Sequence, residues 1–103
     1  MAEWIDYDCE WDPYKAIANL AKHGVAFEDA ATVFRDPWAL TNYDSAHSEI
    51  EDRWITLGQE ANGALLVVIH TFQETHSQRT AIRIVSARKA TPRERRAYEE
   101  LPR

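Results

Sequence analysis

The 103-residue chain has one cysteine, three glycines and no long hydrophobic segment. Cys9 has no second cysteine to pair with, so no internal disulfide can form, and we expect a cytoplasmic protein. The longest apolar run, residues 64–69, is far shorter than the roughly 18 residues of a membrane span, so no membrane partner is expected. The N-terminus is acidic and unlike a secretory signal. Without repeats or linkers, residues 1–103 are expected to form a single domain.

Basic residues are scarce in the first three quarters of the chain. Residues 1–78 contain four Lys and Arg against fourteen Asp and Glu, a net charge of −10. Residues 79–103 contain eight Lys and Arg against three Asp and Glu, a net charge of +5. Such a segment can bind a polyanion or an acidic partner. A solvated helix with interspersed Glu and Arg explains the composition equally well.

Local patterns predict an α+β fold in the order β-α-α-β-β-β-α, in which about four antiparallel strands are flanked by helices. The expected strands are residues 3–7, 53–57, 64–72 and 81–87. The expected helices begin at Asp12-Pro13 and end before Gly24, span residues 27–34, and follow the capping box of Thr91 and Glu94. Residues 38–52 are expected to form a loop and residues 73–80 a polar turn.

Several common catalytic motifs are missing. The sequence contains no phosphate-binding loop, dinucleotide fingerprint or nucleophile elbow, so no cofactor is expected. His47 and Glu51 are four residues apart but lack the further ligands of a zinc site, so no metal is expected. Cys9 lies between Asp8 and Glu10, which disfavours the thiolate that a nucleophile needs.

A scattered set of basic and acidic residues remains as candidate machinery: His47, Glu51 and Arg53 at a loop-to-strand junction, His70 near a strand end, and Arg83, Arg88 and Lys89 on or after a later strand. Antiparallel pairing could bring several of them over one sheet face. They suit metal-free RNA cleavage, in which a base activates the ribose 2′-OH and an acid protonates the departing 5′-oxygen. Arginine or lysine would stabilise the charge that builds on phosphorus.

Each candidate also has a plainer explanation. His47 and Glu51 can belong to a surface turn that is ion-paired with Arg53, and His70 can be a hydrogen-bonded strand histidine. Arg83 lies between Ile82 and Ile84 and therefore points to the sheet face opposite theirs, where it can be an exposed side chain without a functional role. Lys22-His23 can simply favour a helix C-terminus. From these residues alone the function stays open.

Three stretches resemble the BrnT family of ribonuclease toxins from bacterial type II toxin–antitoxin pairs: WDPYKAIANLAKHGVAFEDAATVFRDP, DSAHSEIEDRWITLG and IRIVSARKATPRERRAYEE. The resemblance implies a fold like that of RelE-type toxins and RNA cleavage without a metal. It also implies a BrnA-like antitoxin with a ribbon-helix-helix domain, through which the complex would contact operator DNA and repress its own operon.

The family pattern falls on Lys22, His23, His47, Glu51, Arg53, Arg83 and Arg88. We therefore expect His47, Glu51, Arg53, Arg83 and Arg88 to be catalytic, and Lys22, His23, His70, Arg79 and Lys89 to bind RNA. Many relatives carry an arginine where this chain has Gln73, and Arg79 is the candidate substitute. The departure leaves a second hypothesis: a weak or inactive toxin-like module that docks an antitoxin and co-represses transcription.

Overall fold

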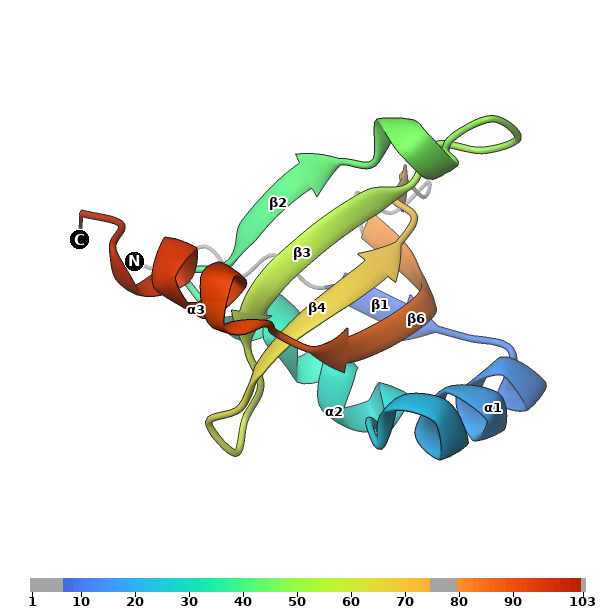
Figure 1. The fold of residues 1–103 in the computed structure, drawn as a ribbon. Coiled ribbons are helices and arrows are strands. Elements are labelled where there is room, and N and C mark those ends of the chain that lie inside the picture. The colour runs from blue at the N-terminus through green and yellow to red at the C-terminus, as the bar shows by residue number, and fades with distance from the viewer. Residues whose placement is uncertain (1–6, 75–79, 103) are drawn as a thin grey trace, which may run out of the picture.

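The computed structural model of the chain describes residues 7–74 and 80–102 (Figure 1). Its elements are β1 (Tyr7–Glu10), α1 (Pro13–His23), α2 (Phe27–Ala31), the 3-10 helix η1 (Thr32–Arg35), β2 (Leu40–Tyr43), the 3-10 helix η2 (Ser45–His47), β3 (Trp54–Gln59), β4 (Leu65–His70), β5 (Gln73–Glu74), β6 (Thr80–Lys89) and α3 (Pro92–Glu99). The α+β class is as expected. The strand predicted at residues 3–7 lies, except for Tyr7, outside the described residues.

The described strands form one mixed sheet in the order β1-β6-β4-β3-β2, and the short β5 also pairs with β6. The expectation of about four antiparallel strands is wrong in two respects. First, β1 runs parallel to β6, whereas the other neighbours are antiparallel. Second, β2 and β5 lie in segments that were predicted to be loop and turn. β2 is hard to recognise because three of its four residues are exposed at the sheet edge.

The helix boundaries follow the predicted capping signals. The Asp12 carboxylate accepts a hydrogen bond from the Tyr14 N–H at 2.8 Å, and α1 ends at Gly24 with φ of 69°. At α3 the capping box is complete, because Thr91 and Glu94 each accept the other's backbone N–H. The second predicted helix is present as α2 continued by η1.

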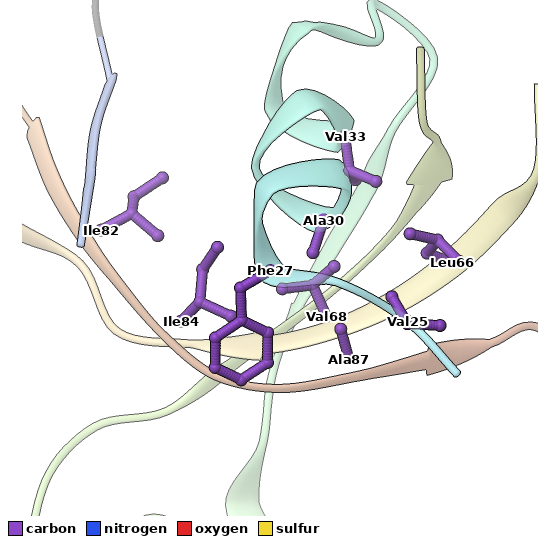
Figure 2. Close-up of a cluster of buried hydrophobic side chains, with 9 residues drawn as sticks. All are labelled: Val25, Phe27, Ala30, Val33, Leu66, Val68, Ile82, Ile84 and Ala87. Carbon is purple, nitrogen blue, oxygen red and sulfur yellow. The ribbon is translucent and has the colours of Figure 1, made fainter. Parts of the chain in front are cut away.

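One face of the sheet packs against α1, α2 and η1. Nine buried hydrophobic residues fill this layer: Val25, Phe27, Ala30, Val33, Leu66, Val68, Ile82, Ile84 and Ala87 (Figure 2). Gly58 on β3 allows η1 to approach closely, since a Cβ there would lie 2.7 Å from Val33 Cγ1. We call this side the helix face of the sheet.

The opposite face is only partly covered, by α3. Tyr98 of α3 packs with Leu57, Leu65 and Val67, and its hydroxyl donates to Asp36 at 2.6 Å. Away from α3, the rest of this face, which is formed by β3, β4 and β6, is not covered by any α-helix of the described residues (Figure 1). We call this area the open face. None of the described helices is long and apolar enough to cross a membrane.

Candidate functional site

A β-bulge in β6 brings two distant arginines onto the open face. Arg83 and Arg88 are five residues apart and would point to opposite faces of a regular strand. The pairing with β4 shifts, however, so that Ile69 faces Ser86 while His70 faces Ile84, and Val85 becomes the extra residue. Ile82, Ile84 and Ala87 consequently all pack on the helix face. Both arginines therefore point to the open face.

The loop between β2 and β3 places His47 beside this face. The Asp44 N–H donates to the Arg53 carbonyl at 2.8 Å, which closes the loop at its base. Inside the loop the Arg53 N–H donates to Ser48 Oγ at 3.0 Å. Asp44 is only 5% exposed, and its carboxylate lies 3.0 Å from His47 Nδ1. His47 is thus fixed through Nδ1, and its side chain stays 69% exposed, which leaves Nε2 for a ligand.

A hollow of about 350 Å³ lies between this loop and the bulged strand. It has an apolar floor and a polar, mainly basic rim, and its lining residues are Asp44, His47, Arg53, Ile55, Ile69, Val85, Ser86 and Arg88. The single carboxylate in this lining is hydrogen-bonded to the histidine. Two guanidinium groups beside an imidazole suit a bound anion such as a phosphodiester. We call this the arginine hollow.

Arg88 is held in place by the first turn of α3. Its Nη1 and Nη2 donate to the two carboxylate oxygens of Glu94 at 2.7 and 3.0 Å. The hydrogen bonds from Arg88 lower the pKa of Glu94 to about 2. A guanidinium has five N–H donors, and the contacts among the described residues leave Nε and one Nη2 donor of Arg88 for a phosphate oxygen. Glu94 therefore orients Arg88 without using all of its donors.

Replacing Glu94 by glutamine tests this contact, because glutamine can still complete the capping box but carries no charge. We expect a loss of about 1 kcal/mol in the free energy of unfolding at pH 7, a value reduced for partial solvent screening. Because the folded pKa of Glu94 is depressed, this stability is present above the unfolded pKa and is lost as pH falls towards 2. Urea denaturation should thus show a smaller difference between wild type and variant at pH 3 than at pH 7.

Glu99→Gln is the matched control, since its partner Arg95 lies 3.6 Å away on an exposed surface, and it should change stability by less than about 0.5 kcal/mol. An equal difference between wild type and Glu94→Gln at pH 3 and pH 7 would contradict the proposed ion pair.

Glu51 links the arginine hollow to a second one. It accepts a hydrogen bond from Arg83 Nη2, and Arg53 Nη2 lies 3.7 Å from the same oxygen. The second hollow, of about 240 Å³, is lined by Glu10, Glu51, Asp52, Thr71, Phe72, Gln73 and Arg83. It has three carboxylates and one arginine, so it suits a phosphate less well than the arginine hollow does. Gln73, where the sequence resemblance leads us to expect an arginine, lines this second hollow together with Arg83.

The expected catalytic residues therefore fall into two neighbouring groups. His47, Arg53 and Arg88 line the arginine hollow, and Glu51 with Arg83 lies directly beside it. Asp44, Ser86 and Glu94 were not singled out from the sequence, although Asp44 fixes His47 and Glu94 fixes Arg88. Glu94 was noted only for its place in the capping box, and Asp44 and Ser86 lie within the stretches that carry the family resemblance but were given no role.

Among the described residues, the structure does not bring the predicted RNA-binding residues together. Lys22 and His23 end α1, which packs on the helix face, whereas the arginine hollow lies on the opposite side of the sheet. Lys89 follows Arg88 on β6, so strand alternation directs it away from the open face. Arg79 lies outside the described residues.

His70 is the clearest correction. It was expected to contact RNA, but it is fully buried on the helix face, against Phe34 with ring centroids 4.7 Å apart. Its Nε2 lies 2.6 Å from the Thr56 hydroxyl, and its Nδ1 lies 3.3 Å from the Thr71 carbonyl. This arrangement fits a neutral ring that donates from Nδ1 and accepts at Nε2. Desolvation by burial lowers the pKa of His70 to about 4. His70 is therefore a core residue and is not carried forward as an RNA contact.

A buried neutral histidine makes stability depend on pH. The unfolded chain takes up a proton near pH 6.5, whereas folded His70 resists protonation down to about pH 4. Stability should therefore fall as pH drops through this window, by up to about 3 kcal/mol. In His70→Gln, whose side chain does not titrate, the melting temperature should fall less between pH 7 and pH 4.5 than in wild type. Identical pH dependence in the two proteins would contradict a neutral His70.

Within the described residues, no group of three or more His, Cys, Asp or Glu side chains could hold a metal ion. Around the arginine hollow, the described carboxylates of Asp44, Glu51 and Glu94 are paired with His47, Arg83 and Arg88 respectively.

Comparison with known proteins assigns the chain to a family. The family profile described as "Ribonuclease toxin, BrnT, of type II toxin-antitoxin system" matches residues 11–94. The 1.1 Å crystal structure of the Brucella abortus ribonuclease toxin BrnT is similar, with a TM-score of 0.57 and 26% sequence identity over 82% of this chain and 96% of that chain. No curated protein sequence matches. The matched residues include all the residues that line the arginine hollow. The chain belongs to the BrnT family of ribonuclease toxins of type II toxin–antitoxin systems.

Proposed function

We propose that the chain is an endoribonuclease toxin that cleaves RNA without a metal ion at the arginine hollow. The observation that carries the proposal is that His47, Arg53 and Arg88 line the same hollow, around an apolar floor on the open face. The surrounding body is acidic, with a net charge of −10 over residues 1–78. Acidic surroundings confine anion binding to the few places where arginines gather.

The cleavage step would use groups that are already in place. The ribose 2′-oxygen attacks the adjacent phosphorus as its proton passes to a base, a 2′-O–P bond forms, and the P–O5′ bond breaks as the 5′-oxygen takes up a proton. The products are a 2′,3′-cyclic phosphate and a 5′-hydroxyl. Arg53 and Arg88 would stabilise the negative charge that builds on the phosphate oxygens.

His47 is the best placed proton-transfer group. Asp44 contacts its Nδ1 at 3.0 Å, which orients the ring and leaves Nε2 to exchange a proton with the substrate. Glu51 is the second candidate for proton transfer, but its carboxylate already accepts from Arg83. We assign Arg83 the role of holding Glu51 beside the arginine hollow.

Family membership implies an antitoxin partner and an RNA target. We further propose that this antitoxin is BrnA-like, with a ribbon-helix-helix domain that carries the complex to operator DNA. Kinship with the RelE-type fold and action in the cytoplasm stay predictions drawn from the sequence.

A second candidate is a weak or inactive toxin that serves as a binding module. Two points favour it: the sequence resemblance leads us to expect an arginine where Gln73 stands, and Arg83 and Arg88 are each paired with a carboxylate. The two candidates differ in what the chain does when it is produced alone.

Induction in bacteria without the antitoxin separates the candidates. We expect wild type to arrest growth and Arg53→Ala or Arg88→Ala to relieve the arrest, whereas Arg35→Ala, at an exposed position of η1, should stay toxic. Normal growth with wild type at equal protein levels would reject the nuclease and favour the module.

A further inference from the structure

The α1 helix presents its apolar side to solvent. Tyr14, Ile17 and Leu20 are 83%, 68% and 52% exposed, and Ala18 and Ala21 are also exposed. At 100° per residue these five positions fall within an arc of about 160°. In a helix of a globular protein, such an apolar arc normally faces the core.

The inner side of α1 is polar at its centre. Asn19 is only 6% exposed, and its amide donates to the carbonyls of Val25 and Ala87 at 3.0 and 2.8 Å, while its oxygen accepts the Ala87 N–H at 3.1 Å. These bonds fix α1 on β6 in one rotational setting. The outward apolar arc is therefore a fixed feature of the fold, at the margin of the molecule (Figure 1).

The charge beside this arc identifies the kind of partner. Lys15 and Lys22 are seven residues apart, so both lie along the same flank of the apolar arc, and both are exposed. The α1 helix contains no Asp or Glu between Pro13 and His23. In an antiparallel two-fold pair of α1 helices, the lysine flanks of both copies would lie on the same side and repel each other. In a parallel pair, each lysine flank would meet the partner's Leu20 side, which offers no carboxylate.

We propose that α1 is the docking surface for the antitoxin, and that its occupant is an amphipathic helix with an apolar seam and Asp or Glu along one flank. The apolar arc of α1 would pack against that seam, and Lys15 and Lys22 would pair with the acidic flank. The proposal rests on the antitoxin partner that family membership implies. Because α1 packs on the helix face, a partner bound there leaves the arginine hollow open. Anchoring of the antitoxin and inhibition of the site are thus separate contacts.

The test measures binding between the full chain and the product of the reading frame that adjoins its gene. The double variant Ile17→Asp/Leu20→Asp should bind roughly 100-fold more weakly by calorimetry, since both side chains would lie at the centre of the interface. Lys15→Glu/Lys22→Glu should also weaken binding, and the wild-type affinity should fall with added salt. Leu101→Asp is the matched control, because it places the same charge at another exposed apolar residue, beyond α3.

The outcomes separate this proposal from the proposed nuclease. Circular dichroism should show the double variant folded, and it should cleave RNA as wild type does, because the substituted residues do not line the arginine hollow. Unchanged affinity of the double variant, or absence of binding by wild type, would overturn the docking surface. If wild type sedimented as a dimer and the double variant as a monomer, the surface would join two copies of this chain. That result would also overturn the proposal. Loss of RNA cleavage in wild type would count against the nuclease alone.

Discussion

Replacing His47 by glutamine is expected to lower the rate of RNA cleavage by roughly 10²–10⁴-fold, the range typical of a lost general acid or base. Glutamine keeps a polar side chain of similar size but cannot exchange a proton near neutral pH. The His47 side chain is 69% exposed, so the substitution should leave the fold intact. Single-turnover cleavage of a labelled RNA measures the effect directly, with binding of the same RNA followed separately by fluorescence anisotropy.

The control for this prediction is His23→Gln. His23 ends α1, on the other side of the sheet from the arginine hollow, and its replacement should leave cleavage unchanged. The cleavage rate of Asp44→Asn should fall between those of the two histidine variants, because asparagine can contact His47 Nδ1 but offers one carbonyl oxygen in place of the two carboxylate oxygens that hold the ring. If His47→Gln cleaved RNA at the wild-type rate, proton transfer would have to be assigned to another residue, with Glu51 as the next candidate.

Replacing Phe27 by alanine should cost about 3–5 kcal/mol of folding free energy, the usual range for a buried phenylalanine. Phe27 is fully buried at the start of α2 (Figure 2). It packs edge-on against Trp11, with ring centroids 6.0 Å apart. Alanine would leave a void between α2 and the sheet, since close-packed neighbours fill such space only in part. A domain of this size has only about 5–15 kcal/mol of stability, so the variant should be largely destabilised.

Urea denaturation measures the loss of folding free energy, and Tyr14→Ala is the control. Tyr14 is also aromatic but is 83% exposed on α1, so its loss should change the free energy of unfolding by less than about 0.5 kcal/mol. Comparable losses in the two variants would show that the packing of Phe27 contributes far less than its burial implies.

The sequence predicted those elements whose cause is local. Asp12-Pro13 and Thr91-Pro92 start helices because their side chains and prolines suit a helix N-terminus wherever it lies in the fold. The strands around residues 54–59, 65–70 and 80–89 were recognisable from apolar or alternating side chains, although their ends were displaced by a few residues.

Features that depend on pairing between distant segments were not predictable. β2 is a strand because its backbone pairs with β3, and its exposed side chains carry no strand pattern. β1 is parallel to its neighbour because it pairs with β6, a strand near the other end of the sequence. β4 is buried on both faces, so its apolar run could not reveal that His70 points into the core.

The candidate site was predictable in its chemistry more than in its geometry. His47, Arg53 and Arg88 were identified from residue type and motif, but their meeting depends on the bulge at Val85. Alternation alone would have placed Arg83 and Arg88 on opposite faces. Asp44 and Glu94 act through contacts with His47 and Arg88, and such contacts become visible only once the loop and α3 are placed.

The most direct test of the account is incubation of the purified chain with single-stranded RNA in excess EDTA, with analysis of the product ends. We expect cleavage to continue under chelation, to yield 2′,3′-cyclic phosphate and 5′-hydroxyl ends, and to be lost in Arg53→Ala. Cleavage that disappears with EDTA, or that leaves 5′-phosphate ends, would contradict the metal-free mechanism at the arginine hollow. Absence of cleavage in every condition would contradict the nuclease itself.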